Sequence, residues 1–353
     1  KIGAEQQVNT TSERSQTMAK VTTLSNDHIV VVWASESDDG FYDIFYQQFD
    51  SDGLRIGEET QINTHTDYAQ VFPDISGLSN GNVVLTWTSF KQDGSYDGVY
   101  GAIINQQGEI IKSEFKVNTN TYHFQNSAKV HGLLNGGFIV TWNSFQQDGS
   151  SYGVYFQMYD SEGTAIGGEV LVNNITYDSQ HDPVINQLPN GGFVVAWVSD
   201  GQDGSGQGVF TKQFDADGIP LNQDTQVNSF NIDHQNSPNI IIFDDGSYLI
   251  TWETSIQDNG DQRSSICGQR FNSNGEKVGT EIDMNGIITV PITIRLTNDG
   301  PSANLSTGVT NEDQQLVLDP LAAASDPNND SLTLLSVTQG QHGTVEIVNQ
   351  KIY

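Results

Sequence analysis

Five tryptophans at an almost constant spacing are the strongest constraint in this sequence. They stand at positions 33, 87, 142, 197 and 252, so successive ones are 54, 55, 55 and 55 residues apart. Self-similarity at a fixed period of tens of residues is the signature of a repeat architecture. An opening motif of an aliphatic residue followed by Asn recurs with the same period. The sequence therefore predicts five repeats, with the limits 8–61, 62–116, 117–171, 172–226 and 227–281.

Each repeat is predicted to contain four short strands. A near-continuous apolar run such as Phe193 to Trp197 is typical of a strand buried on both faces. Asn-Gly or Asp-Gly pairs precede this run in four repeats and favour tight hairpin turns. Four antiparallel strands per repeat predict an all-β fold, a five-bladed β-propeller of 55-residue repeats over residues 1–285. An elongated solenoid is the alternative, although solenoid repeats are shorter and poorer in hairpins.

Charge and composition exclude several functional classes. The chain has 14 Lys and Arg against 44 Asp and Glu, a formal net charge of −30. Such a surface repels phosphate backbones, which excludes nucleic acid as a partner, and it favours divalent cations and an extracellular setting. No apolar run reaches the roughly 18 residues of a membrane span. The single cysteine, Cys267, excludes an internal disulfide and a cysteine-based zinc site. Because the chain begins at Lys1 without a signal-like segment, we expect it to be part of a longer protein.

The composition changes after Gly286. The tail contains a strand-like segment, Ile287–Thr297, and the motifs Asn298–Pro301, Asn311–Asp313, Asp319–Leu321 and Asp326–Leu332. In combination these resemble the junction between cadherin-like, immunoglobulin-type domains of giant bacterial surface proteins. We assign 286–300 to a terminal strand and linker and 301–353 to an incomplete cadherin-like β-sandwich, because such a domain needs about 100 residues. Either the tail is truncated or another strand completes it, donated by Ile287–Thr297 or by a neighbouring copy.

The repeats themselves carry the pattern QDGS, GVY and FDxDG. They resemble the repeats of RTX-type adhesins and haemolysin-type calcium-binding proteins, although the glycine-rich nonapeptide calcium repeats of that family are absent here. The resemblance implies a secreted or cell-surface bacterial protein, with roles in adhesion or biofilm.

The connections between repeats are the predicted ligand-binding surface. Variable polar and aromatic side chains on a rigid scaffold are typical of binding loops. We expect tyrosines there to stack on sugar rings and the neighbouring polar groups to bind hydroxyls. The candidate residues are Tyr68, Tyr122, His123, Tyr177, Asp178 and Asp233. The partners would be glycans, or host or biofilm surface molecules.

Calcium is the predicted cofactor, placed mainly in the tail. Oxygen-only ligands with several carboxylates suit calcium better than a transition metal. The resemblance to cadherin-like junctions implies a site made of Asp299, Glu312, Asp313, Asp326, Asn328 and Asp330. A weaker candidate set, one residue per repeat, is Asp39, Asp93, Asp148, Asp203 and Asp258. The competing interpretation of this second set is a turn residue that accepts the N–H groups of its own loop.

Catalytic signals are weak. Asp74 and Asp182 are the only carboxylates expected near the central mouth, and the prolines beside them give them different registers. The prediction is therefore that the chain is not an enzyme. It is interpreted as an extracellular adhesion or ligand-binding module of a large bacterial surface protein. The alternative is a structural spacer, or a fibre or matrix subunit assembled by strand exchange, and a polysaccharide-active propeller enzyme is less favoured.

Overall fold

The structure is a computed structural model that describes residues 5–232, 234–258 and 261–283 of the repeat region. In the tail it describes 288–289, 302–303, 309–310, 316–319, 321, 324–325, 345–349 and 351–352. Every named element in these stretches is a β-strand, which confirms the all-β prediction. The chain divides into two compact units. The first comprises Lys1–Ser264 and Gly268–Glu281, and the second comprises Ser265–Cys267 and Ile282–Tyr353.

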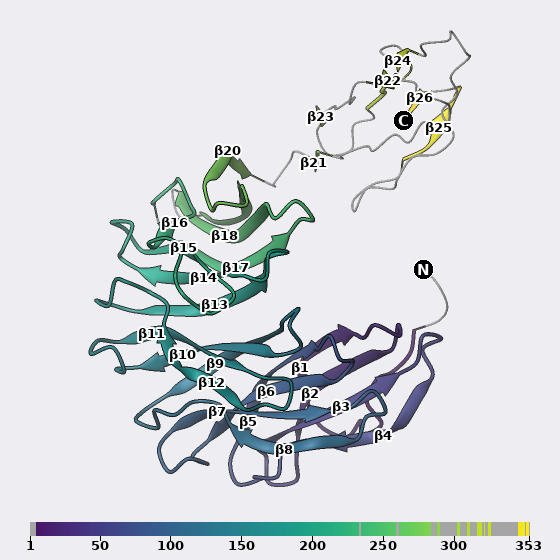
Figure 1. The fold of residues 1–353 in the computed structure, drawn as a ribbon, viewed down its shortest axis with the longest axis vertical. Coiled ribbons are helices and arrows are strands. Elements are labelled where there is room, and N and C mark those ends of the chain that lie inside the picture. The colour runs from purple at the N-terminus through teal and green to yellow at the C-terminus, as the bar shows by residue number, and fades with distance from the viewer. Residues whose placement is uncertain are drawn as a thin grey trace. The chain divides into compact units, whose positions relative to one another are not determined.

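Five antiparallel arrangements of four strands follow one another along the first unit (Figure 1). We number the repeats 1 to 5 in chain order. Repeat 1 contains β1 (Gln16–Thr23), β2 (Ile29–Glu36), β3 (Tyr42–Phe49) and β4 (Arg55–Gln61). Repeat 2 contains β5 (Gln70–Gly77), β6 (Val83–Phe90), β7 (Asp97–Ile104) and β8 (Ile110–Lys116). Repeat 3 contains β9 (Gln125–Gly132), β10 (Phe138–Phe145), β11 (Tyr152–Tyr159) and β12 (Ala165–Leu171). Repeat 4 contains β13 (Gln180–Gln187), β14 (Phe193–Asp200), β15 (Gln207–Phe214) and β16 (Thr225–Gln226). Repeat 5 contains β17 (His234–Ile242), β18 (Tyr248–Asp258), β19 (Asp261–Phe271) and β20 (Lys277–Asp283).

The second strand of each internal repeat is buried on both faces, as its apolar sequence predicts. In β6, β10 and β14 the first seven of eight residues are buried. Their alternate side chains project to opposite faces of the sheet, so each strand contributes to the core on both sides. The tryptophans Trp87, Trp142 and Trp197 are fully buried in this layer. Separate hydrophobic clusters therefore fill the spaces between repeats 1 and 2, repeats 2 and 3, and repeats 3 and 4.

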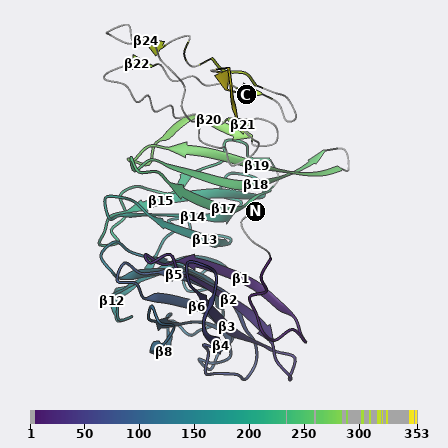
Figure 2. The ribbon, with the colours of Figure 1, turned by 90° about the vertical axis from the view of Figure 1, so that its right-hand side faces the viewer.

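Neighbouring repeats are joined through their first strands. β1 packs on β5, β5 on β9, β9 on β13 and β13 on β17, and Figure 2 shows the successive sheets stacked along the unit. At three of these four junctions, a polar side chain near the end of one first strand accepts a backbone N–H of the next first strand, whereas Asn186 on β13 donates to the Ile240 carbonyl of β17 at 3.3 Å. The three N–H contacts are Gly77 N to Thr22 Oγ1 at 3.2 Å, Gly132 N to Ser76 Oγ at 2.9 Å and Gln187 N to His131 Nε2 at 3.3 Å.

The two terminal repeats each leave one face bare. Val21 on β1 is 62% exposed, whereas its counterpart Ile75 on β5 is 7% exposed. Phe243, nine residues before its tryptophan, is 38% exposed, whereas the equivalent Leu188 is 2% exposed. Within the part of the chain that the structure describes, β17 and β1 share no contact comparable to those between successive repeats. Closure into a single five-bladed ring therefore stays a prediction.

Close backbone approach between repeats makes one glycine indispensable. A Cβ on Gly132, at the end of β9, would overlap the carbonyl oxygen of Gly77 at the end of β5. We expect Gly132→Ala to lower the free energy of unfolding by about 1–3 kcal/mol, because a main-chain atom cannot yield as a side chain does. Gly168→Ala, in β12, is the matched control, since its Cβ would meet nothing within 4 Å. Urea denaturation checks both, and equal stability of the two variants would contradict the close approach.

The second unit contains short paired strands. β21 (Ile288–Thr289) pairs antiparallel with β23 (Val309–Thr310), and β22 (Ser302–Ala303) pairs with β24 (Ala324–Ser325). β25 (Ile347–Val348) pairs with β26 (Lys351–Ile352). The predicted donor segment, 287–297, thus contributes β21 to a pairing within the tail. The remainder of that segment lies outside the described residues. None of the described elements is a helix with the length and apolar character that crossing a membrane requires.

Candidate functional site

A β-bulge interrupts the first strand of every repeat at the same place. The pairing register shifts between Val71 and Asp74 in repeat 2 and between His181 and Val184 in repeat 4, and likewise in the other three. The residue two positions after the recurring Gln has a positive φ in each bulge. A positive φ costs a non-glycine residue conformational free energy. Backbone strain of this kind is concentrated at functional sites, so its occurrence in all five repeats points to a functional role. We call these five residues the bulge ring: Met18 (φ 57°), Phe72 (53°), Ser127 (55°), Asp182 (52°) and Ser237 (54°).

Four bulge-ring residues converge on one cavity of about 300 Å³. They come from the first strands of repeats 2 to 5, so the cavity lies where these strands meet. Phe72, which is 49% exposed, offers an aromatic face, while Ser127 and Ser237 offer hydroxyls. Lys129, Pro183, Val184 and Pro238 complete the lining. A mixture of apolar surface and a few convergent polar groups is typical of a ligand pocket.

Asp182 is held in the cavity by a histidine. His181 Nδ1 lies 3.0 Å from Asp182 Oδ2, and His181 Nε2 lies 3.4 Å from Asp200 Oδ1. Burial by itself lowers the pKa of His181, but hydrogen bonds and charges from Asp182 and Asp200 outweigh it and raise the pKa above 6.5. The hydrogen bond from His181, together with the charges of His181 and Lys129, lowers the pKa of Asp182 below 3.8 against the opposing effect of burial. Asp182 is therefore an ionised group.

Asp74 stands on β5, which packs on the Lys129 strand β9 from the side opposite β13. Its carboxyl tends to stay protonated, whereas that of Asp182 tends to be ionised. Burial raises the pKa of the Asp74 carboxyl above 3.8, although Lys129, Lys20 and the Val130 N–H act against it. That N–H donates to Asp74 Oδ2 at 2.9 Å. The charge of Lys129, which stands on the intervening strand β9, acts to lower the pKa of both Asp74 and Asp182. The two carboxyls do occupy different registers, because Asp182 stands at the bulge of β13 and Asp74 stands two residues after the bulge position of β5. Asp182 lines the cavity, whereas Asp74 is not one of its lining residues.

The connection residues predicted to bind ligand are spread around the same end of the sheets. Tyr122 and Tyr177 are 67% and 53% exposed. Tyr68 packs edge-on against Phe41 and Phe90, and the His123 ring stacks on Tyr96 at 6.1 Å. Three of the set have a positive φ, namely Tyr68, His123 and Asp178. Each connection leads within four or five residues into the bulge of its strand, but no ring contact among the described residues joins Tyr68, Tyr122 and Tyr177. Asp233 lies outside the described residues.

The bulge ring was not predicted from the sequence, although a signal for it exists. The first-strand Gln is constant in all five repeats, while the residue two positions later is Met, Phe, Ser, Asp or Ser. The connections between repeats were predicted to bind ligand because their residues vary while the rest of the repeat recurs. The position two residues after the Gln varies in the same way. The constant Gln proves to be structural, since Gln70, Gln125, Gln180 and Gln235 are fully buried.

The structure describes most of the weaker set of predicted metal ligands but none of the tail set. The six tail residues, from Asp299 to Asp330, lie outside the described residues. In the weaker set, one carboxylate oxygen of Asp93, Asp148 and Asp203 accepts the N–H of the residue two positions on, each at 3.1 Å. Asp39 does the same at 3.0 Å. These are the turn contacts of the competing interpretation. The side chain of Asp258 is not described, and the described residues contain no group of three or more His, Cys, Asp or Glu that could hold a metal ion.

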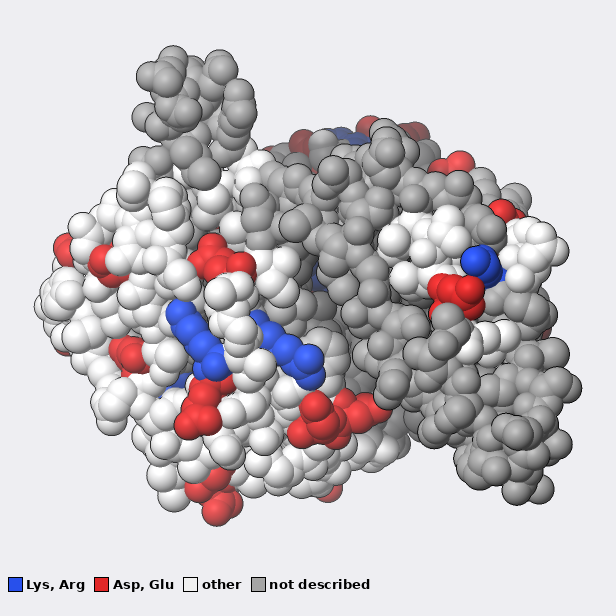
Figure 3. Space-filling view, turned by 90° about the horizontal axis from the view of Figure 1, so that it is seen from above, with Lys and Arg blue, Asp and Glu red and all other residues white. Residues whose placement is uncertain are grey.

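The surface charge is mixed in spite of the strong net negative charge. In Figure 3 the Lys and Arg side chains in view have Asp or Glu side chains close beside them. Such neighbours partly cancel the field of each positive group, because salt screens charges little when they are closer together than a Debye length. This surface therefore has no broad positive field on the side shown.

Comparisons with known proteins address the tail and the fold. The sequence model of the bacterial Ig domain matches residues 298–353, which confirms the immunoglobulin-type prediction for the tail. No curated protein matches this chain in sequence. Among solved structures, a protein of unknown function from Dyadobacter fermentans superposes with a TM-score of 0.54 at 11% identity, over 78% of this chain and 85% of that one. An α-L-arabinanase from Penicillium chrysogenum gives 0.48 at 13% identity, over 76% and 93%.

These matches also correct one prediction. An α-L-arabinofuranosidase from Lactobacillus brevis matches with a TM-score of 0.42 at 12% identity, over 74% of this chain and 93% of that one. The prediction that the chain is not an enzyme is corrected, because the structures it resembles include carbohydrate-active enzymes of the β-propeller class. At these identities the similarity concerns the fold and does not transfer an activity.

Proposed function

We propose that this chain is an extracellular carbohydrate-active module, in which five four-stranded blades of a propeller present a polysaccharide-binding and polysaccharide-cleaving site at the bulge ring. The observation that carries the proposal is the pair Asp74 and Asp182. Their environments move the two pKa values in opposite directions, and their strands, β5 and β13, both pack on β9, which carries Lys129. Pairs of carboxyls with separated pKa values are the arrangement that divides acid and base roles in glycoside hydrolysis.

Each residue has a chemical role in this proposal. Asp74, whose carboxyl tends to keep its proton, donates it to the glycosidic oxygen as the bond to the leaving sugar breaks. Asp182, held ionised by His181, acts on the opposite side as base toward water or as nucleophile. Lys129 stabilises the negative charge that develops on Asp74 as its proton is transferred. Phe72 provides the aromatic face on which a sugar ring stacks.

The exposed tyrosines suggest how a longer glycan is held. Tyr122 and Tyr177 stand at connections that lead directly into the bulges of repeats 3 and 4. A polysaccharide bound at the cavity would extend over these connections, which fits attachment to glycans of a bacterial or host surface. The Ig domain at 298–353 supports a place in a multidomain surface protein. The RTX-type character, adhesion and strand donation stay predictions.

The proposal is tested with a panel of soluble polysaccharides, comprising neutral pentose polymers, neutral hexose polymers and uronate-containing polymers. Calorimetry reports binding, and the appearance of new reducing ends reports cleavage. We expect Phe72→Ala to weaken binding about fivefold, since a stacked aromatic is worth about 1 kcal/mol beyond its area. Phe41→Ala removes an aromatic of similar exposure outside the cavity and serves as the control. Failure of every polymer to bind, or equal losses in the two variants, would exclude the proposed site.

A further inference from the structure

A polar cluster recurs behind the Gln-Asp-Gly loop of repeats 2 and 3, away from the bulge ring. In repeat 2, Ser89 on β6 pairs directly across the sheet with Gly98 on β7. Directly opposed residues project from the same face of a sheet. A Cβ on Gly98 would lie 3.0 Å from Asp93 Oδ2, so that carboxylate oxygen occupies the space beside Ser89. In repeat 3, Ser144 pairs with Gly153, whose Cβ would lie 2.7 Å from Asp148 Oδ2.

Three oxygen atoms of each cluster are buried and have no hydrogen-bond partner. In repeat 2 they are Ser89 Oγ, Gln92 Oε1 and Asp93 Oδ2, and Ser89 is fully buried. In repeat 3 they are Ser144 Oγ, Gln147 Oε1 and Asp148 Oδ2, and Ser144 is likewise fully buried. Buried polar atoms in folded proteins are nearly always paired. The same three oxygens unpaired in two repeats point to an absent group that oxygen atoms would bind.

A second carboxylate belongs to each cluster. Gln92 Nε2 donates to Glu114 on β8, and Gln147 Nε2 donates to Glu169 Oε2 on β12 at 2.7 Å. Burial raises the pKa of Tyr100, and the charges of Asp93 and Glu114 raise it further. Burial likewise raises the pKa of Tyr155 to about 12, together with the charges of Asp148 and Glu169. A Cβ on Gly98 would meet both Asp93 Oδ2 and the Tyr100 ring, so this carboxylate lies beside the tyrosine of its cluster. No described Lys or Arg forms an ion pair with any of the four carboxylates.

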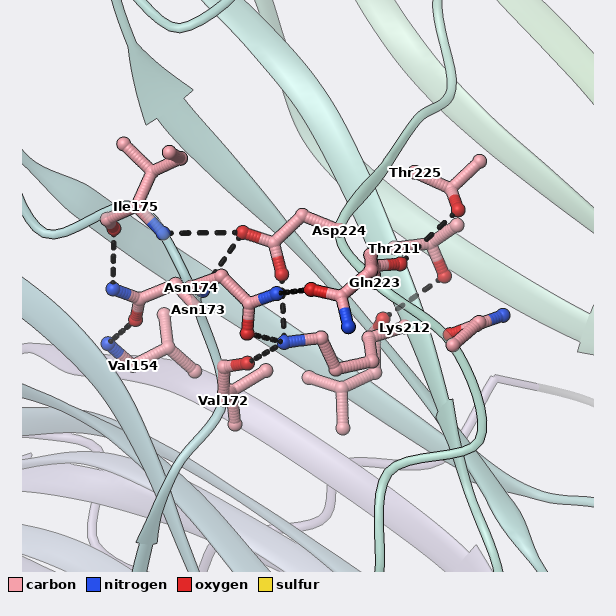
Figure 4. A network of polar contacts seen from close by, with 12 residues as sticks. Val154, Val172, Asn173, Asn174, Ile175, Thr211, Lys212, Gln223, Asp224 and Thr225 are labelled. Atoms are coloured by element: carbon pink, nitrogen blue, oxygen red, sulfur yellow. Dashed lines mark hydrogen bonds and ion pairs between the residues drawn. The ribbon is translucent and has the colours of Figure 1, made fainter.

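Repeat 4 contains a buried positive charge beside the counterpart of this second carboxylate (Figure 4). Lys212 stands two residues before the end of β15, where repeats 2 and 3 have Ala102 and Gln157. Its buried ammonium group lies 2.7 Å from Asp224 Oδ1. Asp224 is the counterpart of Glu114 and Glu169, because all three accept a backbone N–H from the opening loop of their own repeat.

The remaining oxygens of repeat 4 are mostly satisfied as well. Asp203 Oδ2 accepts a hydrogen bond from Asn228 Nδ2 at 3.0 Å, and Ser199 Oγ contacts Gln180 Nε2 at 3.5 Å. The atoms equivalent to the three unpaired oxygens of repeats 2 and 3 are Ser199 Oγ, Gln202 Oε1 and Asp203 Oδ2. Of these, only Gln202 Oε1 has no hydrogen-bond partner. The repeat that contains its own buried cation thus lacks most of the unpaired oxygens of repeats 2 and 3.

We propose that the clusters of repeats 2 and 3 each bind one calcium ion. The protein ligands are Ser89 Oγ, Gln92 Oε1 and the carboxylates of Asp93 and Glu114 in repeat 2. Those of repeat 3 are Ser144, Gln147, Asp148 and Glu169. A donor set made only of oxygens selects a hard cation over a transition metal. Calcium accepts six to eight oxygens in flexible geometry, so water completes the shell, whereas magnesium demands a near-ideal octahedron. The proposal is independent of the proposed carbohydrate site.

Terbium luminescence tests the proposal on the full chain. Terbium replaces calcium at oxygen sites, and it is sensitised by nearby aromatic rings, here Trp87 and Tyr100 or Trp142 and Tyr155, which are paired across their strands next to the clusters. We expect the Asp93→Asn/Asp148→Asn variant to lose two equivalents of sensitised terbium that calcium chloride displaces from the unmodified chain. The Asp50→Asn/Asp160→Asn variant removes two charges from turns at the other end of the sheets and is expected to lose none.

A second variant keeps the test decisive if the first does not fold. Glu114→Gln/Glu169→Gln removes the other carboxylate of each cluster, and tryptophan fluorescence reports whether the core of each variant is intact. We expect the same loss of two equivalents. Unchanged terbium stoichiometry in either folded variant would overturn the proposal, and so would an equal loss in the Asp50→Asn/Asp160→Asn control.

Discussion

Replacement of Asp224 by Ala is expected to lower the free energy of unfolding by about 3–5 kcal/mol. The Lys212 ammonium group is 3% exposed and lies 2.7 Å from the Asp224 carboxylate. It also donates to Asn174 Oδ1 at 2.7 Å and to the Val172 carbonyl (Figure 4). Without Asp224 the ammonium loses its counter-charge in a buried site, and the N–H of Asn174 loses its acceptor. Urea denaturation monitored by tryptophan fluorescence measures the change.

The surface ion pair of repeat 1 provides the control for this measurement. Arg14 lies 2.6 Å from Asp38, whose side chain is 99% exposed. Asp38→Ala is expected to cost about 0–1 kcal/mol, because water and salt screen an exposed pair. A small loss in Asp224→Ala, comparable to that in Asp38→Ala, would mean that Lys212 finds water or another acceptor when its partner is removed.

Asp182→Asn is expected to reduce cleavage of a bound polysaccharide by about 10²–10⁴-fold, the usual contribution of a positioned acid or base. The amide keeps the shape of the side chain but cannot act as base or nucleophile. Since the pKa of Asp182 is lowered below 3.8 and that of Asp74 is raised above it, activity should fall on both sides of this region. It is lost at low pH as Asp182 becomes protonated and at higher pH as Asp74 loses its proton. Initial rates of reducing-end release across the acidic pH range measure both effects.

Asp217→Asn is the matched substitution for this experiment. Asp217 lies in the turn after β15, at the opposite end of the sheet from the bulge, where its N–H bonds to Asp215. Its replacement should leave the rate and the pH profile unchanged. Full activity in Asp182→Asn would remove the carboxyl pair from the mechanism, even if the polysaccharide still binds the cavity.

The repeat architecture was predictable from the sequence because periodic residues have periodic roles. The Asn of the opening motif recurs since its side chain bonds the third strand, as when Asn118 Oδ1 accepts the Val99 N–H at 2.7 Å. Its amide also donates to the buried Gln125 at 3.2 Å. Buried polar groups must be paired, so such residues cannot vary, and the repeat remains visible in the sequence.

The candidate site was less predictable because it depends on how neighbouring strands are aligned. A bulge shifts the inward and outward alternation of a strand by one position, and these polar first strands have too few apolar residues for the shift to be read from the sequence. The residues around Phe72 and Asp182 do not predict a left-handed backbone conformation. Both residues precede a proline, and a residue before proline favours an extended conformation. The placement of Asp74 and Asp182 on the two strands that pack against β9, which carries Lys129, likewise depends on how three adjacent first strands pack.

The constancy of the bulge has a consequence for how specificity can change. The backbone of this position holds φ between 52° and 57° whether the side chain is Met, Phe, Ser or Asp. The conformation is set by the strand pairing on either side, so the side chain is free to differ. Four of these five positions line the cavity, so four separate codons determine part of its surface without determining the conformation of the strands. On the proposed function, single substitutions at these positions would exchange one sugar preference for another while the sheets stay intact.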